Sequence, residues 1–122
     1  MAIVAPTTVD ISGDGSVYKI TWALTTADHT GAAINGTSWA DRTVLFQSVA
    51  WGGATAAVEG SNDNSVFLPL ADVQGTAISK SANGIESVVE LTQYLQPRLT
   101  TVGTAAAVTV SIVARRATPL RT

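Results

Sequence analysis

The most regular feature of this sequence is an alternation of apolar and polar residues with a period of two. In an extended chain, successive side chains point to opposite faces, so alternate apolar residues form one buried row. In Val17–Leu24 such a row consists of Tyr18, Ile20, Trp22 and Leu24. In Ala107–Ala114 a second row consists of Val108, Val110, Ile112 and Ala114. Both segments are therefore predicted to be strands with one face in the core.

Shorter segments of the same kind fill the rest of the chain. They are Thr7–Ile11, Thr43–Val49, Thr55–Glu59, Val66–Leu70, Thr76–Ser79, Ile85–Leu91 and Tyr94–Leu99. Turn-forming residues separate them, as in Gly60–Ser65 and at Asn83-Gly84. Pro69 and Pro97 lack a backbone donor, so they predict edge strands or bulges.

Eight or nine short strands with turns between them, and no segment of helical period, indicate a sandwich or barrel. The fold class we predict is all-β: a jelly-roll-like antiparallel β-sandwich of about eight strands. The length of 122 residues fits one domain spanning residues 1–122. An extended N-terminal arm (residues 1–6) and a short basic C-terminal tail (residues 115–122) are expected to flank the sandwich. The strand order does not follow from the sequence.

Composition limits the functions that fit this chain. Only 13% of the residues are charged, about half the usual share, and the net charge is −2. Nucleic-acid binding therefore has no electrostatic basis. No apolar run approaches the roughly 20 residues of a membrane span. The chain has no cysteine, which excludes disulfides and thiolate metal sites and fits synthesis in a reducing cytoplasm.

Candidate catalytic groups are few and isolated. His29 is the only histidine, and no Gly-x-Ser-x-Gly motif accompanies it. Glu86 and Glu90 lie on one face of one predicted strand, roughly 13 Å apart, which is too far for either glycosidase arrangement; exposure to solvent or pairing with Arg98 is expected instead. We therefore expect no enzyme, no cofactor and no catalytic or metal-binding residues, although a bound cation stays open.

The candidate interface residues come from the irregular segments. Ala27–Arg42 is predicted to be a long loop, which brings Trp39 and Arg42 to the surface, and Trp51 lies in a turn. Aromatic and arginine side chains are preferred anchors of protein interfaces. The tail adds Arg115, Arg116 and Arg121 after the last predicted strand, as a strap onto an acidic partner surface, and the N-terminal arm is a second strap. Stacking of Trp39 or Trp51 on a sugar is the alternative, and the composition favours the interface.

The C-terminal half resembles a known class of proteins. The run Val58-Glu59-Gly60-Ser61-Asn62-Asp63-Asn64 is followed by Val66-Phe67-Leu68-Pro69-Leu70 and Asp72-Val73-Gln74-Gly75. Val88-Val89-Glu90, Tyr94-Leu95-Gln96-Pro97-Arg98 and Val108-Thr109-Val110-Ser111-Ile112 complete the order. This order resembles the capsid decoration (cement) proteins of tailed bacteriophages, which are of β-sandwich or jelly-roll type. The motifs are strand and turn patterns, and no catalytic residue is carried over.

The resemblance implies a structural role in a virion. The protein would bind the outside of a phage head and bridge subunits of the major capsid protein, so that the shell resists the pressure of packaged DNA. It would act as a homodimer or homotrimer on the capsid surface. Its partners would be the major capsid protein and itself, with neither nucleic acid nor membrane.

The alternative is a carbohydrate-binding β-sandwich module of a phage tail fibre or of a secreted enzyme. Discoidin-like carbohydrate-binding domains share the pattern of a strand, a Gly-Ser-Asn-Asp turn and a second strand. In this chain the turn is followed by Ser65-Val66-Phe67, without the usual tryptophan, and the cysteine pair of many such domains is missing. The sequence therefore favours the virion hypothesis.

Overall fold

The computed structural model describes residues 2–37 and 39–116, and all its regular elements are strands. The strands are β1 (Ile3–Val4), β2 (Thr7–Asp10), β3 (Val17–Thr25), β4 (Thr30–Gly31), β5 (Ile34–Asn35), β6 (Trp39–Ala50), β7 (Thr55–Ser61), β8 (Leu68–Pro69), β9 (Ser79–Lys80), β10 (Gly84–Ser87), β11 (Tyr94–Thr101) and β12 (Ala107–Arg116). Within this part of the chain, no helix is long and apolar enough to cross a membrane.

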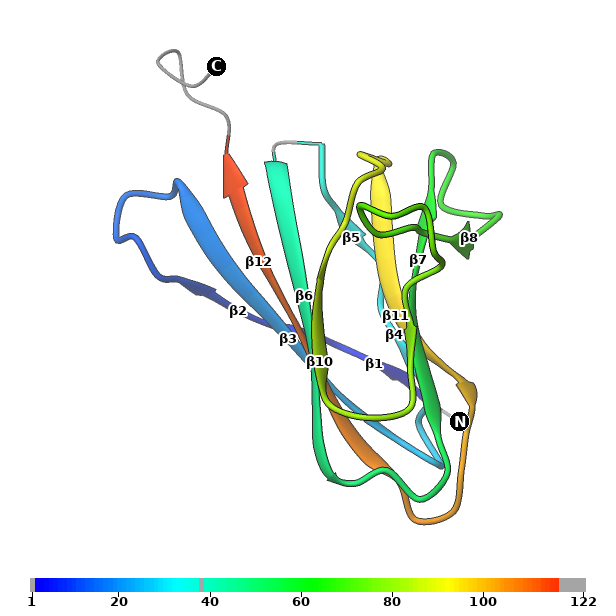
Figure 1. The fold of residues 1–122 in the computed structure, drawn as a ribbon. Helices are drawn as coiled ribbons and strands as arrows, with labels where there is room; N and C mark the ends of the chain where they lie inside the picture. Colours follow the sequence, from blue (N-terminus) through cyan, green and yellow to red (C-terminus); the bar gives the residue numbers. More distant parts are fainter. Residues whose placement is uncertain (1, 38, 117–122) are drawn as a thin grey trace.

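The strands form two sheets that pack face to face (Figure 1). The five-stranded sheet has the order β10-β6-β12-β3-β2, and all its pairs are antiparallel. The seven-stranded sheet has the order β1-β4-β11-β7-β8, with β5 paired to β11 and β9 paired to β7. The predicted all-β sandwich is therefore confirmed.

The order of the strands is that of a jelly roll. From β3 onward, most connections carry the chain from one sheet to the other, so that β3-β12-β6-β10 faces β4-β11-β7-β8. The structure has twelve strands rather than about eight. Four additional strands account for the difference. Two of the eight jelly-roll strands are each interrupted and counted twice, as β4 with β5 and as β8 with β9, and β1 and β2 precede the jelly roll.

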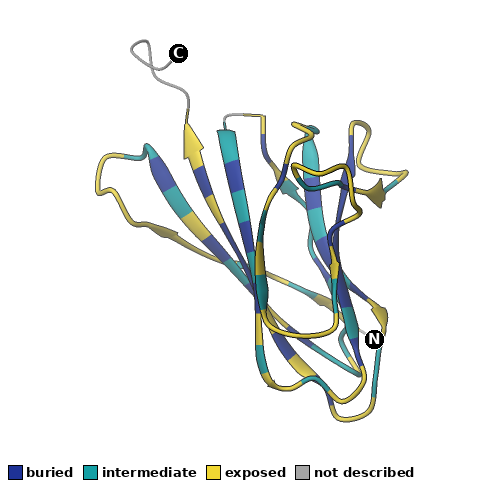
Figure 2. Cartoon of the chain, in the orientation of Figure 1, coloured by how far each residue is buried: buried dark blue, intermediate teal, exposed yellow. Residues whose placement is uncertain are grey.

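The core lies between the two sheets and follows the predicted rows. Burial alternates along β3, β6 and β12, as the banding in Figure 2 shows. The largest fully buried side chains include Trp22 and Phe46 from one sheet and Leu95 and Leu99 from the other. Trp22 also donates a hydrogen bond from Nε1 to the carbonyl oxygen of Ala32 (3.0 Å), which fixes the indole against the opposite sheet.

The N-terminal arm is bound to its own domain. Ile3–Val4 form β1, which pairs in parallel with β4, and the amide of Ala32 donates to the carbonyl of Val4 (2.8 Å). The amide of Ala2 donates to Asp28 Oδ1 (2.8 Å). The arm is therefore extended, as predicted, and the edge of its own seven-stranded sheet holds residues 2–4.

Several predicted boundaries are wrong where strands are very short. Ala27–Arg42 is not one loop, because it contains β4, β5 and the start of β6. The predicted strand Ile85–Leu91 ends at Ser87. Two-residue strands carry no measurable period, so they arise only from pairing with a long neighbour such as β11.

The two prolines have different outcomes. Pro69 lies in β8 at a sheet edge, as predicted. Pro97 lies in β11, which is inside the sheet, so an edge strand is wrong there. Leu99 donates its amide to the carbonyl of His29, and with a period of two the nitrogen of Pro97 faces the same side. The antiparallel register that pairs Arg98 with Thr30 places Pro97 opposite Gly31, the last residue of β4, so the ladder lacks one hydrogen bond where β4 ends.

The close approach of the sheets at Gly31 gives a test of the packing. A Cβ on Gly31 would lie 2.6 Å from Trp22 Cδ1 and 2.7 Å from Pro97 Cγ. We expect Gly31→Ala to lower the free energy of unfolding by about 1–3 kcal/mol, because these buried groups must move. Gly84→Ala is the matched control, since its Cβ would meet Lys80 Cδ at an ordinary 3.4 Å. Equal urea midpoints for both variants would contradict this packing.

Candidate functional site

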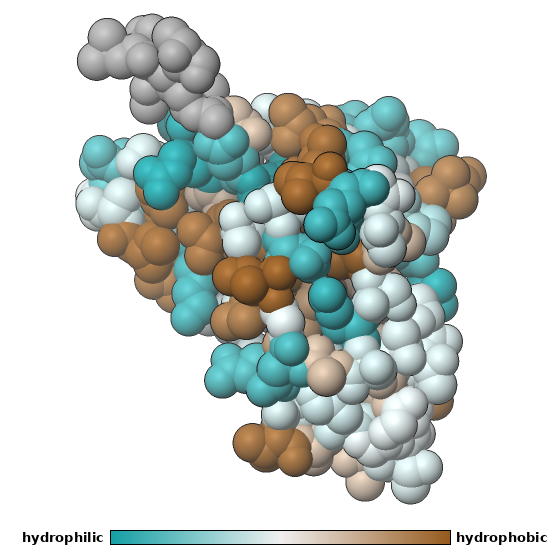
Figure 3. Space-filling model, in the orientation of Figure 1, coloured by the Kyte–Doolittle hydropathy of each residue, from teal (hydrophilic) through white to brown (hydrophobic). Residues whose placement is uncertain are grey.

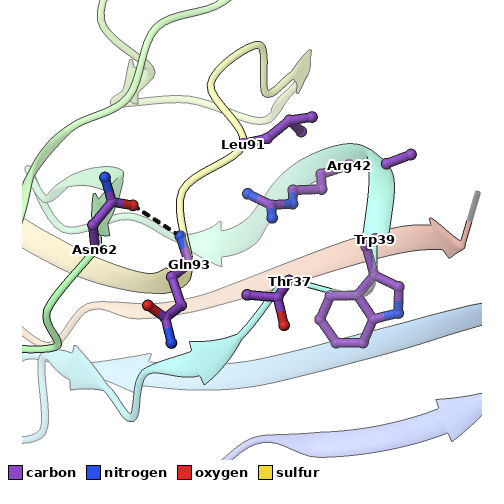
Figure 4. A pocket seen from close by; sticks show the side chains of 7 residues that line it. Thr37, Trp39, Arg42, Asn62, Leu91 and Gln93 are labelled. Atoms are coloured by element: carbon purple, nitrogen blue, oxygen red, sulfur yellow. Dashed lines mark hydrogen bonds between the residues drawn. The ribbon is translucent and has the colours of Figure 1, made fainter.

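A cavity of about 410 Å³ opens at the end of the sandwich where β6 begins and β7 ends (Figure 4). Its lining residues are Thr37, Trp39, Ala40, Arg42, Asn62, Leu91 and Gln93. A neighbouring cavity of about 390 Å³ shares Ala40, Arg42 and Leu91 with it, and also contacts Val73 and Val89. These two cavities and their lining residues are called the end surface below.

Arg42 is the charged centre of the end surface. It is only 3% exposed, because position 42 continues the inward row of Val44 and Phe46 along β6. Its Nη2 donates to the carbonyls of Gly36 (2.6 Å) and Thr92 (2.9 Å), and its Nη1 makes a longer contact with that of Glu90 (3.4 Å). Burial lowers the pKa of this guanidinium from its ordinary value.

The hydrogen-bond partners of this guanidinium among the described residues are all neutral carbonyls, and Asp41, the acidic residue next to it in β6, lines the neighbouring cavity. Ion pairs in that part of the chain join Lys80 to Glu86 and Arg98 to Glu59. The sequence analysis offered pairing of Arg98 with Glu86 or Glu90 as one possibility, and this pairing is wrong because Arg98 pairs with Glu59. Glu90 instead accepts the amide of Ala71 through its carboxylate (2.7 Å). A buried cation held by neutral carbonyls alone is costly unless a further partner is supplied.

Trp39 forms the other wall of the end surface. Its indole is half-buried, packs against the core and lies 6.2 Å from the ring of Tyr18, centroid to centroid. Trp39 Nε1 and Arg42 Nε are buried without an acceptor in the described structure. Such orphaned donors are uncommon in protein interiors, and both belong to residues that line this cavity. Figure 4 shows the indole nitrogen on the edge of the ring that faces away from Arg42.

The polar wall comes from the turn after β7. Asn62 Oδ1 accepts the amide of Gln93 (3.1 Å), which ties the turn to the segment before β11. Next to it, Asp63 Oδ1 accepts the amides of Val66 and Ser65 and the hydroxyl of Ser61. These bonds, that of Val66 above all, lower the pKa of Asp63 to about 2.

The outer rim is apolar. Val73, Val89 and Leu91 are 76%, 52% and 59% exposed, and all three line the second cavity. Brown areas in Figure 3 mark apolar residues on the visible face of the molecule. The sequence analysis missed this rim, together with Thr37, Asn62 and Gln93. Val89 and Leu91 were the available signal for the rim. They were assigned instead to the predicted strand Ile85–Leu91, which ends at Ser87.

The structure brings two of the predicted interface residues together and separates others. Trp39 and Arg42 share one cavity, but both lie in β6 rather than in a loop, and the buried guanidinium of Arg42 holds neighbouring segments in place. Trp51 follows the far end of β6, as predicted for a turn. It is half-buried there, and its Nε1 donates to Asn83 Oδ1 (2.9 Å).

The predicted basic tail begins later than expected. Arg115 and Arg116 are the last residues of β12, and the register places Arg116 opposite Trp39. Arg116 also donates its amide to the carbonyl of Ser16 (2.8 Å). Starting the tail at residue 115 is therefore wrong, because the ladder continues through both residues. Arg121 lies outside the described residues.

A metal site requires several ligating side chains arranged around one ion. No group of three or more His, Asp or Glu residues in the part of the chain that the structure describes is arranged to hold a metal ion. The ring of His29 contacts the hydroxyl of its neighbour Thr30 at 3.5 Å, and no carboxylate bonds to it within residues 2–37 and 39–116.

Comparisons with known proteins do not assign the chain to a family. No protein-family model matches it, and no curated protein matches it in sequence.

The bonds of Arg42 predict a structural cost for its replacement. We expect Arg42→Lys to lower the free energy of unfolding by about 1–3 kcal/mol, because one ammonium group cannot reach three carbonyls placed for a planar guanidinium. Urea unfolding measures this loss. Arg115→Lys, at an exposed position of β12, is the matched control and should change stability by less than about 0.5 kcal/mol. Equal effects at the two positions would contradict the bonding role of Arg42.

Asp63 predicts an acid dependence of stability. Its pKa is about 2 in the fold and 3.8 in an unperturbed chain. The folded state therefore gains stability from the ionised group above pH 4, and this gain is lost as the pH falls through about 2. Asp63→Asn keeps an acceptor oxygen but has no charge. The urea midpoint of this variant should therefore decrease less between pH 5 and pH 2 than the midpoint of the unsubstituted protein. An unchanged decrease would contradict the assignment.

Proposed function

We propose that this protein is a non-enzymatic structural protein of a phage virion. It binds the outside of the head and bridges subunits of the major capsid protein, which stabilises the shell. The observation that carries the proposal is the end surface: an aromatic ring and an arginine line one of its cavities, and exposed aliphatic side chains line the neighbouring cavity, which shares the arginine. Protein interfaces concentrate their binding energy in centres of this composition.

The exposed apolar residues support docking onto another protein. Val73, Val89 and Leu91 lie side by side around one cavity instead of singly over the surface. Clustered apolar residues with a polar border are typical of interaction sites, whereas single ones need no explanation. Here the border is supplied by Thr37, Asn62 and Gln93.

A second surface fits the expected self-association. The outward face of the five-stranded sheet has a shallow cavity of about 280 Å³, with Lys19 as its one charged lining residue among those described. The other lining residues are neutral: Thr21, Thr43, Leu45, Gln47, Ile85, Thr109, Ser111 and Val113. A face with so little charge opposes association weakly, which supports a homodimer or homotrimer.

The jelly roll supports the proposal only in part. Jelly rolls build viral capsid proteins, but they also build lectins, and a fold alone does not select a function. The resemblance of Val58–Arg116 to capsid decoration proteins favours the first use.

Carbohydrate binding is the second candidate, because the cavity has a tryptophan beside amide side chains. Trp39, Asn62 and Gln93 are residue types that stack on sugar rings and bond to their hydroxyl groups. The isolated protein would then bind one sugar on a glycan array as a monomer. The half-buried indole and the aliphatic rim favour a protein partner instead.

Sedimentation with empty heads from the same source tests the proposed function. We expect a dimer or trimer that sediments with the heads at a fixed stoichiometry. Val73→Asp should weaken this binding by about tenfold or more, because it places a carboxylate in an apolar contact. Val49→Asp is the matched control, since Val49 is fully exposed near the opposite end of β6 and should leave binding unchanged.

A stable monomer that stays in the supernatant when the heads sediment would contradict the virion function. If that monomer binds a specific glycan, the carbohydrate-binding module takes its place.

A further inference from the structure

We propose that the cavity beside Arg42 is a carboxylate-binding site, which receives an acidic side chain of the partner protein. The choice of a protein as the source of the carboxylate rests on the proposed function. The preference for a carboxylate rests on the charge and the unused donors of the cavity, which can be tested without any partner.

The first argument is charge. The guanidinium of Arg42 is almost completely buried, and its described partners are neutral carbonyls. No acidic residue lines the 410 Å³ cavity, and Asp41 lines only the neighbouring cavity. Electrostatic attraction is stronger in such a partly desolvated site than in water, so a carboxylate from outside would meet an uncompensated positive charge.

The second argument is the number of unused donors. A guanidinium has five N–H groups, and Arg42 uses both on Nη2 and one on Nη1. Nε and the second N–H of Nη1 have no acceptor among the described residues. Figure 4 shows the guanidinium facing the chain segment of Leu91 and Gln93, where backbone carbonyls accept from it, with both of these side chains lining the cavity beside it.

Neutral donors complete the site. Asn62 uses its amide oxygen to accept the backbone of Gln93, so its NH2 group is available. Gln93 contributes a second side-chain amide to the same wall. Hydrogen bonds from amides and from an arginine are the contacts that an ionised carboxylate accepts.

The rim indicates why the carboxylate belongs to a protein. Leu91 lines this cavity, and Val73 and Val89 line the neighbouring cavity that shares Leu91 and Arg42 with it. An acidic sugar with its hydroxyl groups would be poorly matched to this exposed apolar surface. A glutamate or aspartate on a protein surface brings neighbouring side chains that cover such a rim. Apolar residues that exclude water around a charged contact are typical of protein hot spots.

Titration with small probes tests the site itself. The probe is N-acetyl-glutamate N-methylamide, and the isosteric control is N-acetyl-glutamine N-methylamide, which has no charge. In ¹⁵N-labelled protein, the Nε–H signal of Arg42 and the indole N–H signal of Trp39 should shift with the glutamate probe until saturation. The glutamine probe should leave them in place. Equal responses to both probes, or no response to either, would overturn the proposal.

Paired substitutions test the charge within the chain. Leu91 lies between Glu90 and Thr92, whose carbonyls contact Arg42, so an acid at position 91 would lie beside the guanidinium. We expect Leu91→Glu to have a higher urea midpoint than Leu91→Gln and to lose its response to the glutamate probe. Leu68→Glu and Leu68→Gln are the matched controls at an equally exposed position in β8, and they should have equal midpoints. No difference between the two variants at position 91 would overturn the proposal.

Binding to heads separates this inference from the proposed function. If both hold, Leu91→Glu binds heads about tenfold or more weakly than Leu91→Gln, because the site is already filled. If the protein binds heads but both variants bind equally, the carboxylate site is wrong and the virion function stands. If the glutamate probe binds but heads do not, the site stands and the function is wrong. Saturation by glucuronate at a tenfold lower concentration than by the glutamate probe would overturn the choice of a protein partner.

Discussion

The pairing of β12 between β3 and β6 is the interaction on which the rest of the structure depends. Both ladders are antiparallel and run along almost the whole of β12. Without this last strand, β3 and β6 have no direct pairing, since the sheet order places β12 between them. Its inward residues Val108, Val110 and Ile112 are buried against the opposite sheet. The sandwich is therefore closed by a contact between segments distant in sequence.

This pairing also creates the end surface. Along β6, the period of two that buries Val44 and Phe46 turns Arg42 inward as well. A charge in that position needs acceptors, and the carbonyls of Gly36 and Thr92 supply them from segments outside the ladders. One buried arginine thus holds the loop before β6 and the segment before β11 around a common cavity. The same contacts hold Leu91, which lies between Glu90 and Thr92.

The site illustrates why sequence reasoning found only part of it. Trp39 and Arg42 were selected for their residue types, and the structure places them in one cavity. The expectation that they lie in a loop was wrong, because the start of β6 carries no clear alternation and is extended by its pairing with β12. Asn62, Leu91 and Gln93 reach the cavity through turns and long-range contacts, which leave no periodic signal.

The sequence by itself determined the all-β class, the inward faces of β3 and β12, and the positions of several turns. These features are local, because strand periodicity and turn residues act within a few positions of each other. The strand order, the short strands β4, β5, β8 and β9, and the docking of residues 3–4 were decided by the tertiary structure. So was the burial of Arg42 without an acidic partner. Each depends on which distant segments become neighbours, and only the packing of the two sheets determines that.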